Sequence, residues 1–131
     1  MPERIFTLSE AVSLIPRLRA ILNDLCDDWN LIKALNPQIK KARDKAQFDG
    51  GSPYGVEYIE TMTRVMSKLQ QVRDLGVILK DVDKGLCDFP HMKGGRVVYL
   101  CWMLGEETIG FWHDIESGFG GREPLDPSDH D

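Results

Sequence analysis

The sequence predicts an α+β fold in which a long antiparallel helical hairpin packs on a small antiparallel β-meander of three to four strands. Apolar residues recur at three- and four-residue spacing up to Gly76, and from Val77 onward they alternate at a period of two. A chain of 131 residues has the size of one domain with one core. We expect a single domain over 1–131, made of a helical hairpin (1–76), a meander with a Gly-rich loop (77–122) and an acidic tail (123–131).

The first helix is expected to begin at a capping box formed by Thr7 and Glu10. The apolar stripe that follows is long enough for about four heptads of helix. Pro16 cannot donate a hydrogen bond to the carbonyl of Val12, so a bend is expected near residues 12–16. Asn36-Pro37 is expected to end the helix.

The second helix is expected to return alongside the first. Residues 37–52 predict frayed helix and then a mobile turn, because they end in Asp-Gly-Gly-Ser before Pro53. Ser52-Pro53 is a typical helix start, and Leu75-Gly76 is a typical helix end. The basic residues of the connection, Lys40, Lys41, Arg43 and Lys45, are expected to lie on a solvated face. Each apolar stripe is too wide for the other helix to cover, so a sheet must cover the rest.

The strands of that sheet are expected at 77–82, 85–90, 96–103 and 108–113. Gly105-Glu106 suits a two-residue type II′ turn, which would pair Leu100 with Phe111 and Tyr99 with Trp112. One face of the sheet would then pack on the hairpin. The other face would carry a row made of Asp88, Tyr99 and Trp112.

The same register separates residues that are attractive for catalysis. His113 would fall opposite Val98 on the core face, about 20 Å from Glu106 at ~3.3 Å per residue. Cys87 and Cys101 would lie on opposite faces, which argues against a disulfide between them. The metal-binding residue types are therefore expected to be scattered, and we expect neither a metal nor a cofactor.

Four segments together resemble an uncharacterised prokaryotic family, domain of unknown function 2203. They are Phe6–Ala11 with Leu14 and Pro16, Gly76–Pro90, Val98–Glu106, and Trp112-His113 with Gly118–Arg122. The resemblance spans nearly the whole chain and is weakest over residues 36–58. It implies a helical hairpin with a small sheet, and it supplies no catalytic residue.

Composition excludes several partners. A net charge of −5 and a pI near 5.2 argue against nucleic-acid binding and against a polybasic membrane surface. The chain opens on an amphipathic stretch rather than a signal peptide, and no window approaches ~20 apolar residues, so we expect a cytoplasmic protein. The three cysteines have no C-x-x-C spacing and are expected to be reduced.

These patterns predict a small cytoplasmic interaction or ligand-binding protein without classical catalytic machinery. The partner that we expect is a second copy of the chain, which would form a homo-oligomer (a dimer) through the aromatic row. Gly118–Arg122 could also hold a small anionic ligand, although a tight loop in which Arg122 pairs with Asp88 or Glu116 is favoured. The alternative is a metal- or anion-dependent enzyme centred on Asp88, His113 and Arg122. The candidate ligand- or partner-binding residues are Asp88, Tyr99, Trp112, His113 and Arg122.

Overall fold

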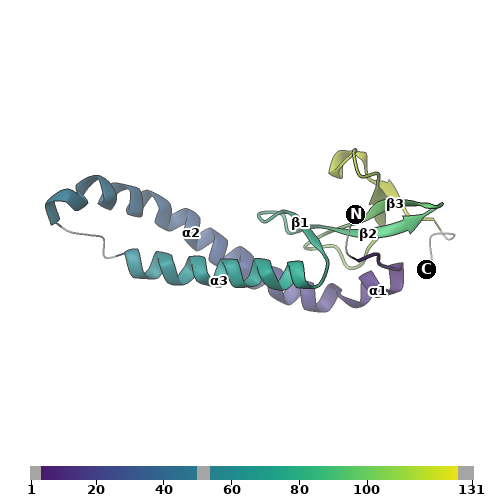
Figure 1. Ribbon diagram of the computed structural model, residues 1–131, viewed down its shortest axis with the longest axis horizontal. Helices are drawn as coiled ribbons and strands as arrows, with labels where there is room; N and C mark the ends of the chain where they lie inside the picture. Colours follow the sequence, from purple (N-terminus) through teal and green to yellow (C-terminus); the bar gives the residue numbers. More distant parts are fainter. Residues whose placement is uncertain (1–3, 50–53, 127–131) are drawn as a thin grey trace.

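The computed structural model describes residues 4–49 and 54–126 as two long packed helices and a five-stranded antiparallel meander (Figure 1). In chain order the elements are α1 (Leu8–Ser13), α2 (Ile15–Asp49), α3 (Gly55–Asp74), β1 (Ile78–Asp81), β2 (Leu86–Lys93), β3 (Arg96–Met103), β4 (Phe111–His113), a 3₁₀ turn (Phe119–Gly121) and β5 (Glu123–Pro124). The predicted α+β fold is confirmed, with one more strand than expected. Within the described ranges, no helix has the length and apolar character needed to cross a membrane.

The predicted capping box starts α1. The Thr7 hydroxyl accepts a hydrogen bond from the Glu10 amide at 3.1 Å, and the Glu10 carboxylate accepts one from the Thr7 amide at 2.8 Å. The expected bend is instead a break, because α1 ends at Ser13 and α2 begins at Ile15. Pro16 has no N–H to offer the preceding turn, so the helical hydrogen-bond ladder is interrupted at this point.

Asn36-Pro37 does not end the helix, contrary to expectation, since α2 continues through Pro37 to Asp49. A proline removes one hydrogen bond from a helix and bends it, but the residues that follow can resume the ladder. The residues after Pro37 include Lys, Ala, Gln and Arg, which favour helix. The expected cap at Ser52-Pro53 lies outside the described residues, while α3 ends at Asp74 with Leu75 as its cap.

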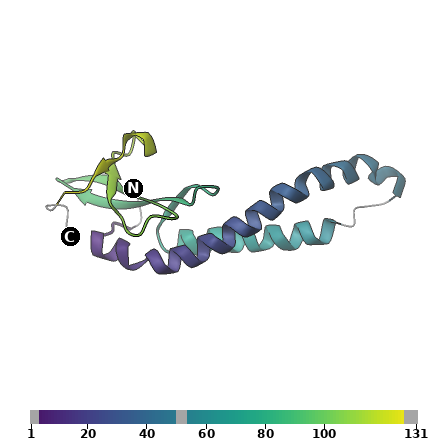
Figure 2. The ribbon, with the colours of Figure 1, turned by 180° about the vertical axis from the view of Figure 1, so that it is seen from behind.

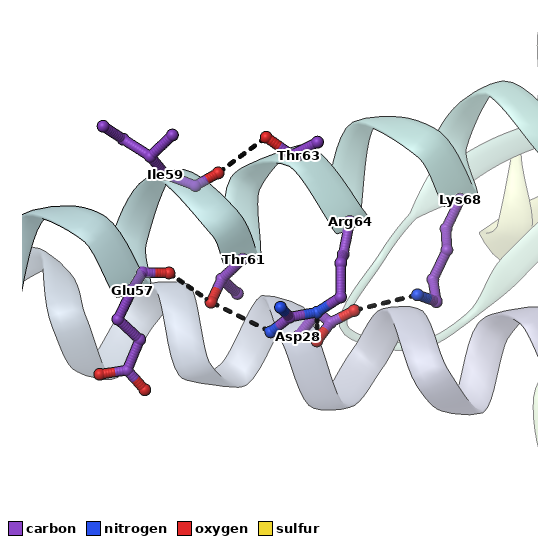
Figure 3. A network of polar contacts seen from close by, with 7 residues as sticks. All are labelled: Asp28, Glu57, Ile59, Thr61, Thr63, Arg64 and Lys68. Carbon is purple, nitrogen blue, oxygen red and sulfur yellow. Dashed lines mark hydrogen bonds and ion pairs between the residues drawn. The ribbon is translucent and has the colours of Figure 1, made fainter.

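A network of charged side chains joins α2 to α3 (Figure 3). Asp28 of α2 accepts hydrogen bonds from Arg64 Nε at 3.1 Å and from Lys68 Nζ at 3.2 Å, both on α3. Burial raises the pKa of Asp28, but its two cationic partners outweigh burial and leave the pKa below the ordinary value. Arg64 also donates to the Thr61 hydroxyl at 3.1 Å, which ties the pair to the buried face of α3.

The sheet covers only part of the hairpin. Phe6 donates a backbone hydrogen bond to Pro90 at 2.7 Å, and its ring meets Phe89 edge-on at 5.4 Å, so the chain start is fastened to β2. Along α2 the sheet reaches at least to Lys33, which pairs with Asp83. The rest of the hairpin extends away from the sheet as an arm in both views (Figures 1 and 2).

The β2–β3 turn lies one residue beyond the Lys93-Gly94 turn that the sequence predicts, which shifts the pairing of the two strands by two residues. Lys93 pairs with Arg96, so Gly94 and Gly95 form the turn, with φ of 58° and 80°. Both values lie in the left-handed region that glycine adopts without strain. The shift is even, so each side chain stays on its predicted face, and Asp88 lies opposite Cys101 rather than Tyr99.

The β3–β4 register differs from expectation by one residue, which exchanges the faces of β4. Leu100 pairs with Trp112, and Tyr99 pairs with His113. The expected two-residue turn does not form, because Glu106 bonds back to Met103: its amide donates to the Met103 carbonyl at 3.0 Å, and its carboxylate accepts from the Met103 amide at 2.7 Å. Residues 123 and 124, expected in an acidic tail, pair with β4 instead.

Candidate functional site

The one-residue shift places His113 on the same face of the sheet as Asp88. Nε2 of His113 in β4 lies 2.9 Å from Oδ1 of Asp88 in β2, and each residue is 2% exposed. Strand β3 lies between them and places Cys101, with 0% exposure, directly opposite Asp88. Three side chains from three adjacent strands therefore converge beneath the surface.

The hydrogen bond of the His113 ring to a backbone carbonyl shows which ring nitrogen carries a hydrogen. Nδ1 of His113 lies 2.8 Å from the backbone carbonyl oxygen of Asp114, and that oxygen can only accept, so Nδ1 carries a hydrogen. Nε2 then faces Asp88 in one of two forms: a neutral ring accepting from a protonated carboxyl, or an imidazolium donating to a carboxylate. Both forms hold one proton between the two side chains.

Burial raises the pKa of Asp88, while the hydrogen bond and charge of His113 and the charge of Lys80 oppose that increase. Cys101 also bonds to Asp88 through its thiol. Burial raises the pKa of Cys101 to about 11, although the charge of Arg122 opposes it. A thiol with this pKa is protonated near neutral pH, so Cys101 is not an activated nucleophile in this state.

The three donor atoms of Asp88, Cys101 and His113 lie within 4.8 Å of one another. A carboxylate oxygen, a thiol sulfur and an imidazole nitrogen are the types of ligand that zinc takes in proteins. The prediction that metal-binding residue types are scattered is wrong for these three, because it depended on the β4 register. The predicted face of Cys101 is correct, but the sequence does not indicate that Cys101 joins Asp88 and His113.

Arg122 does not contact Asp88. Its guanidinium binds the Glu106 carboxylate at 2.9 and 3.1 Å and lies over the rings of Phe111, at 3.9 Å, and Phe119, at 4.7 Å. Within the described part of the chain, its buried Nε has no hydrogen-bond partner. Arg122 thus fastens the Gly-rich segment to the β3–β4 loop, through a carboxylate that the sequence did not pair with it.

The remaining two candidates occupy different faces. Tyr99 remains on the face of Asp88, with its ring centroid 5.5 Å from that of His113. Trp112 pairs with Leu100 instead, is 9% exposed and belongs to the core. The expected row of Asp88, Tyr99 and Trp112 therefore does not form.

The predicted separation of the buried cysteines is confirmed. Cys87 pairs with Trp102, whereas Cys101 pairs with Asp88, so their side chains point to opposite faces. Both are free thiols, as is Cys26. Burial raises the pKa of Cys87 to about 12, so this thiol is also protonated near neutral pH.

An open groove with a volume of about 510 Å³ lies beside the site, lined by Arg96, Val97 and residues 114–117. The Arg96 guanidinium in this groove pairs with the Asp114 carboxylate at 2.6 Å. Asp114 also supplies the carbonyl that orients His113. The groove is therefore linked to the buried group through the backbone of one residue.

Comparison with known proteins places the whole fold in one family. Residues 4–125 match a family described as "Uncharacterized conserved protein (DUF2203)". The chain matches no curated protein and no solved structure. The match covers α1, α2, α3 and all five strands, including Asp88, Cys101 and His113. The chain belongs to the DUF2203 family.

Proposed function

We propose that this protein is a small cytoplasmic interaction protein that pairs with a second copy of itself through α3. The observation that carries the proposal is an exposed apolar stripe on the arm. Val56 is 69% exposed, Ile59 66% and Met66 61%. Apolar side chains exposed along one helix face are typical of an association surface.

The stripe lies on the side of α3 that faces away from α2. At 100° per residue, Val56, Ile59 and Met66 fall within one quarter of the helix circumference, roughly opposite the buried Val65. The Ile59 side chain points away from α2 in Figure 3. The hairpin therefore leaves this face open to a partner.

This surface replaces the one expected from the sequence. Asp88 and Trp112 are buried, at 2% and 9% exposure, so the expected row offers no continuous face to a partner. The arm extends beyond the sheet, and a second arm could lie against it without contact between the two sheets (Figures 1 and 2). Two hairpins side by side would form a four-helix bundle.

A second copy could lie in antiparallel orientation, related by a twofold axis at the middle of the stripe. The exposed apolar side chains of each α3 would then face those of the other. A cytoplasmic location agrees with the three free thiols, which an oxidising compartment would expose to disulfide exchange.

Light scattering during gel filtration at several protein concentrations tests this proposal. The wild type is expected to approach twice the monomer mass at high micromolar concentration. Ile59→Glu and Met66→Glu are expected to remain monomeric, because each places a charge within the apolar stripe. Gln71→Glu, a matched change on the same helix outside the stripe, should dimerise like the wild type. A wild type that stays monomeric throughout would contradict the proposal.

The contact between Asp88 and His113 favours a second candidate function, an enzyme that uses this pair as acid and base. The expected third member, Arg122, binds Glu106 instead, and an anion would have to displace that carboxylate. Both members of the pair are 2% exposed, which leaves a substrate little access in this conformation. We therefore favour the interaction protein.

A further inference from the structure

We propose that Asp88, Cys101 and His113 form a binding site for a zinc-class divalent metal ion. This inference goes beyond the proposed self-association and does not depend on it. The site lies in the sheet, whereas the exposed stripe lies on the arm. Either proposal can therefore fail while the other stands.

The spacing of the donor atoms is close to that of a zinc site. In a tetrahedral site with metal–ligand distances of about 2.0–2.3 Å, the ligand atoms are roughly 3.3–3.7 Å apart. The three donor atoms here lie within 4.8 Å of one another, and Nε2 of His113 is 2.9 Å from Oδ1 of Asp88. The separations between the donor atoms would therefore have to change by less than about 1.5 Å to match this spacing.

The second ring nitrogen of His113 is already held as it is in many metal sites. Histidine ligands commonly donate their other N–H to a carbonyl or a carboxylate, which fixes the tautomer and directs the free lone pair to the metal. Here Nδ1 of His113 donates to the Asp114 carbonyl at 2.8 Å, and Nε2 lies 2.9 Å from Oδ1 of Asp88. This bond is independent of the clustering of the three donor atoms.

The charges balance once the ion is bound. A divalent cation with one thiolate, one carboxylate and one neutral imidazole has no net charge, which suits a site whose three residues are at most 2% exposed. Binding releases two protons to solvent, one from the Cys101 thiol and one shared by Asp88 and His113. Three protein donors leave one tetrahedral position for water or another ligand.

The donor set also indicates which ions would bind. A thiolate and an imidazole favour Zn²⁺, and Co²⁺ as its spectroscopic substitute, over Mg²⁺ or Ca²⁺, which prefer oxygen ligands. Selectivity for the softer ions is therefore part of the proposal. A site that preferred Mg²⁺ would not use Cys101.

Titration of chelator-treated, untagged full-length protein with Co²⁺ tests the site. One equivalent is expected to produce thiolate-to-cobalt charge-transfer absorption and visible bands of tetrahedral cobalt, both of which Zn²⁺ should remove. Cys101→Ser should abolish the charge-transfer absorption. His113→Gln should weaken binding by at least the ~10–100-fold that loss of a metal site's supporting partners causes.

A double variant keeps the test valid if Cys101→Ser fails to fold. Cys26→Ser combined with Cys87→Ser leaves Cys101 as the one thiol of the chain, because the sequence contains three cysteines. If this folded variant keeps the absorption, the thiolate ligand is Cys101. Loss of the absorption in the double variant, or no charge-transfer band in the wild type, would overturn the proposal.

Discussion

Asp88 and His113 lie 25 residues apart in the chain, yet they share a hydrogen bond of 2.9 Å in a part of the sheet that solvent hardly reaches. Their strands, β2 and β4, do not pair directly, and each is hydrogen-bonded to β3. The contact therefore requires both ladders to be in register. A shift of one residue in either ladder would turn one of the two side chains to the other face.

Loss of the Asp88 carboxylate is expected to destabilise the metal-free protein. Asp88→Ala should lower the free energy of unfolding by about 2–4 kcal/mol, because it leaves Nε2 of His113 buried without a partner. Asp88→Asn should cost roughly 1 kcal/mol or less, since its amide can donate to a neutral imidazole. Urea unfolding in the presence of a chelator measures both values. Equal stability of Asp88→Ala and the wild type would show that the contact contributes nothing to folding.

The ion pairs of Asp28 with Arg64 and Lys68 predict a dependence of stability on pH. The pKa of Asp28 is lower in the folded protein than its ordinary value of 3.8, so its stabilisation is complete above that value and is lost as the pH falls through the lowered pKa. Asp28→Asn should be less stable than the wild type by about 1–3 kcal/mol at pH 7. The difference should vanish in strong acid.

Asp27→Asn provides the matched control for this change, because Asp27 is an exposed neighbour with the same charge. It should lower the stability at pH 7 by less than about 0.5 kcal/mol. Thermal unfolding of the wild type, Asp28→Asn and Asp27→Asn between pH 2 and pH 7 measures these differences in stability. A constant difference between Asp28→Asn and the wild type over this whole range would contradict the assignment.

Glu106 is expected to fasten the C-terminal segment to the sheet, because it binds both the Met103 amide and Arg122. Glu106→Ala should cost about 1–3 kcal/mol and leave the Arg122 guanidinium without its carboxylate. Hydrogen exchange should become faster at the Met103 amide and at Leu125, whose amide bonds to Gly110. Glu107→Ala, at an exposed neighbouring position, should leave exchange unchanged. Unaltered exchange in Glu106→Ala would argue against this role.

The sequence predicts the elements that depend on local patterns. Residues close in the chain determine the capping box of Thr7 and Glu10 and the end of the second helix near Leu75. They also determine which face of the sheet each side chain of β2 and β3 occupies. The expectation that Asn36-Pro37 ends the helix is wrong because a proline weakens a helix without always ending it, and α2 continues through Pro37. Local rules cannot decide between these two outcomes.

The candidate site was missed because its register depends on contacts between distant residues. A longer loop forms in place of the expected tight turn, because the Glu106 carboxylate binds the Met103 amide. The same carboxylate also binds Arg122, which is 16 residues away in the chain. This loop shifts β4 by one residue, which brings His113 to Asp88 and sends Trp112 to the core. The predicted face of Cys101 is correct, so the site could not be predicted only because the sequence does not show the form of the β3–β4 loop.

X-ray absorption at the zinc K-edge tests the central claim most directly. Full-length protein loaded with one equivalent of Zn²⁺ should give one sulfur neighbour at about 2.3 Å, with the remaining nitrogen and oxygen neighbours at about 2.0–2.2 Å. The sulfur neighbour should persist when Cys26 and Cys87 are both replaced by serine, because Cys101 then remains. A zinc environment made of nitrogen and oxygen alone would contradict a site formed by Asp88, Cys101 and His113.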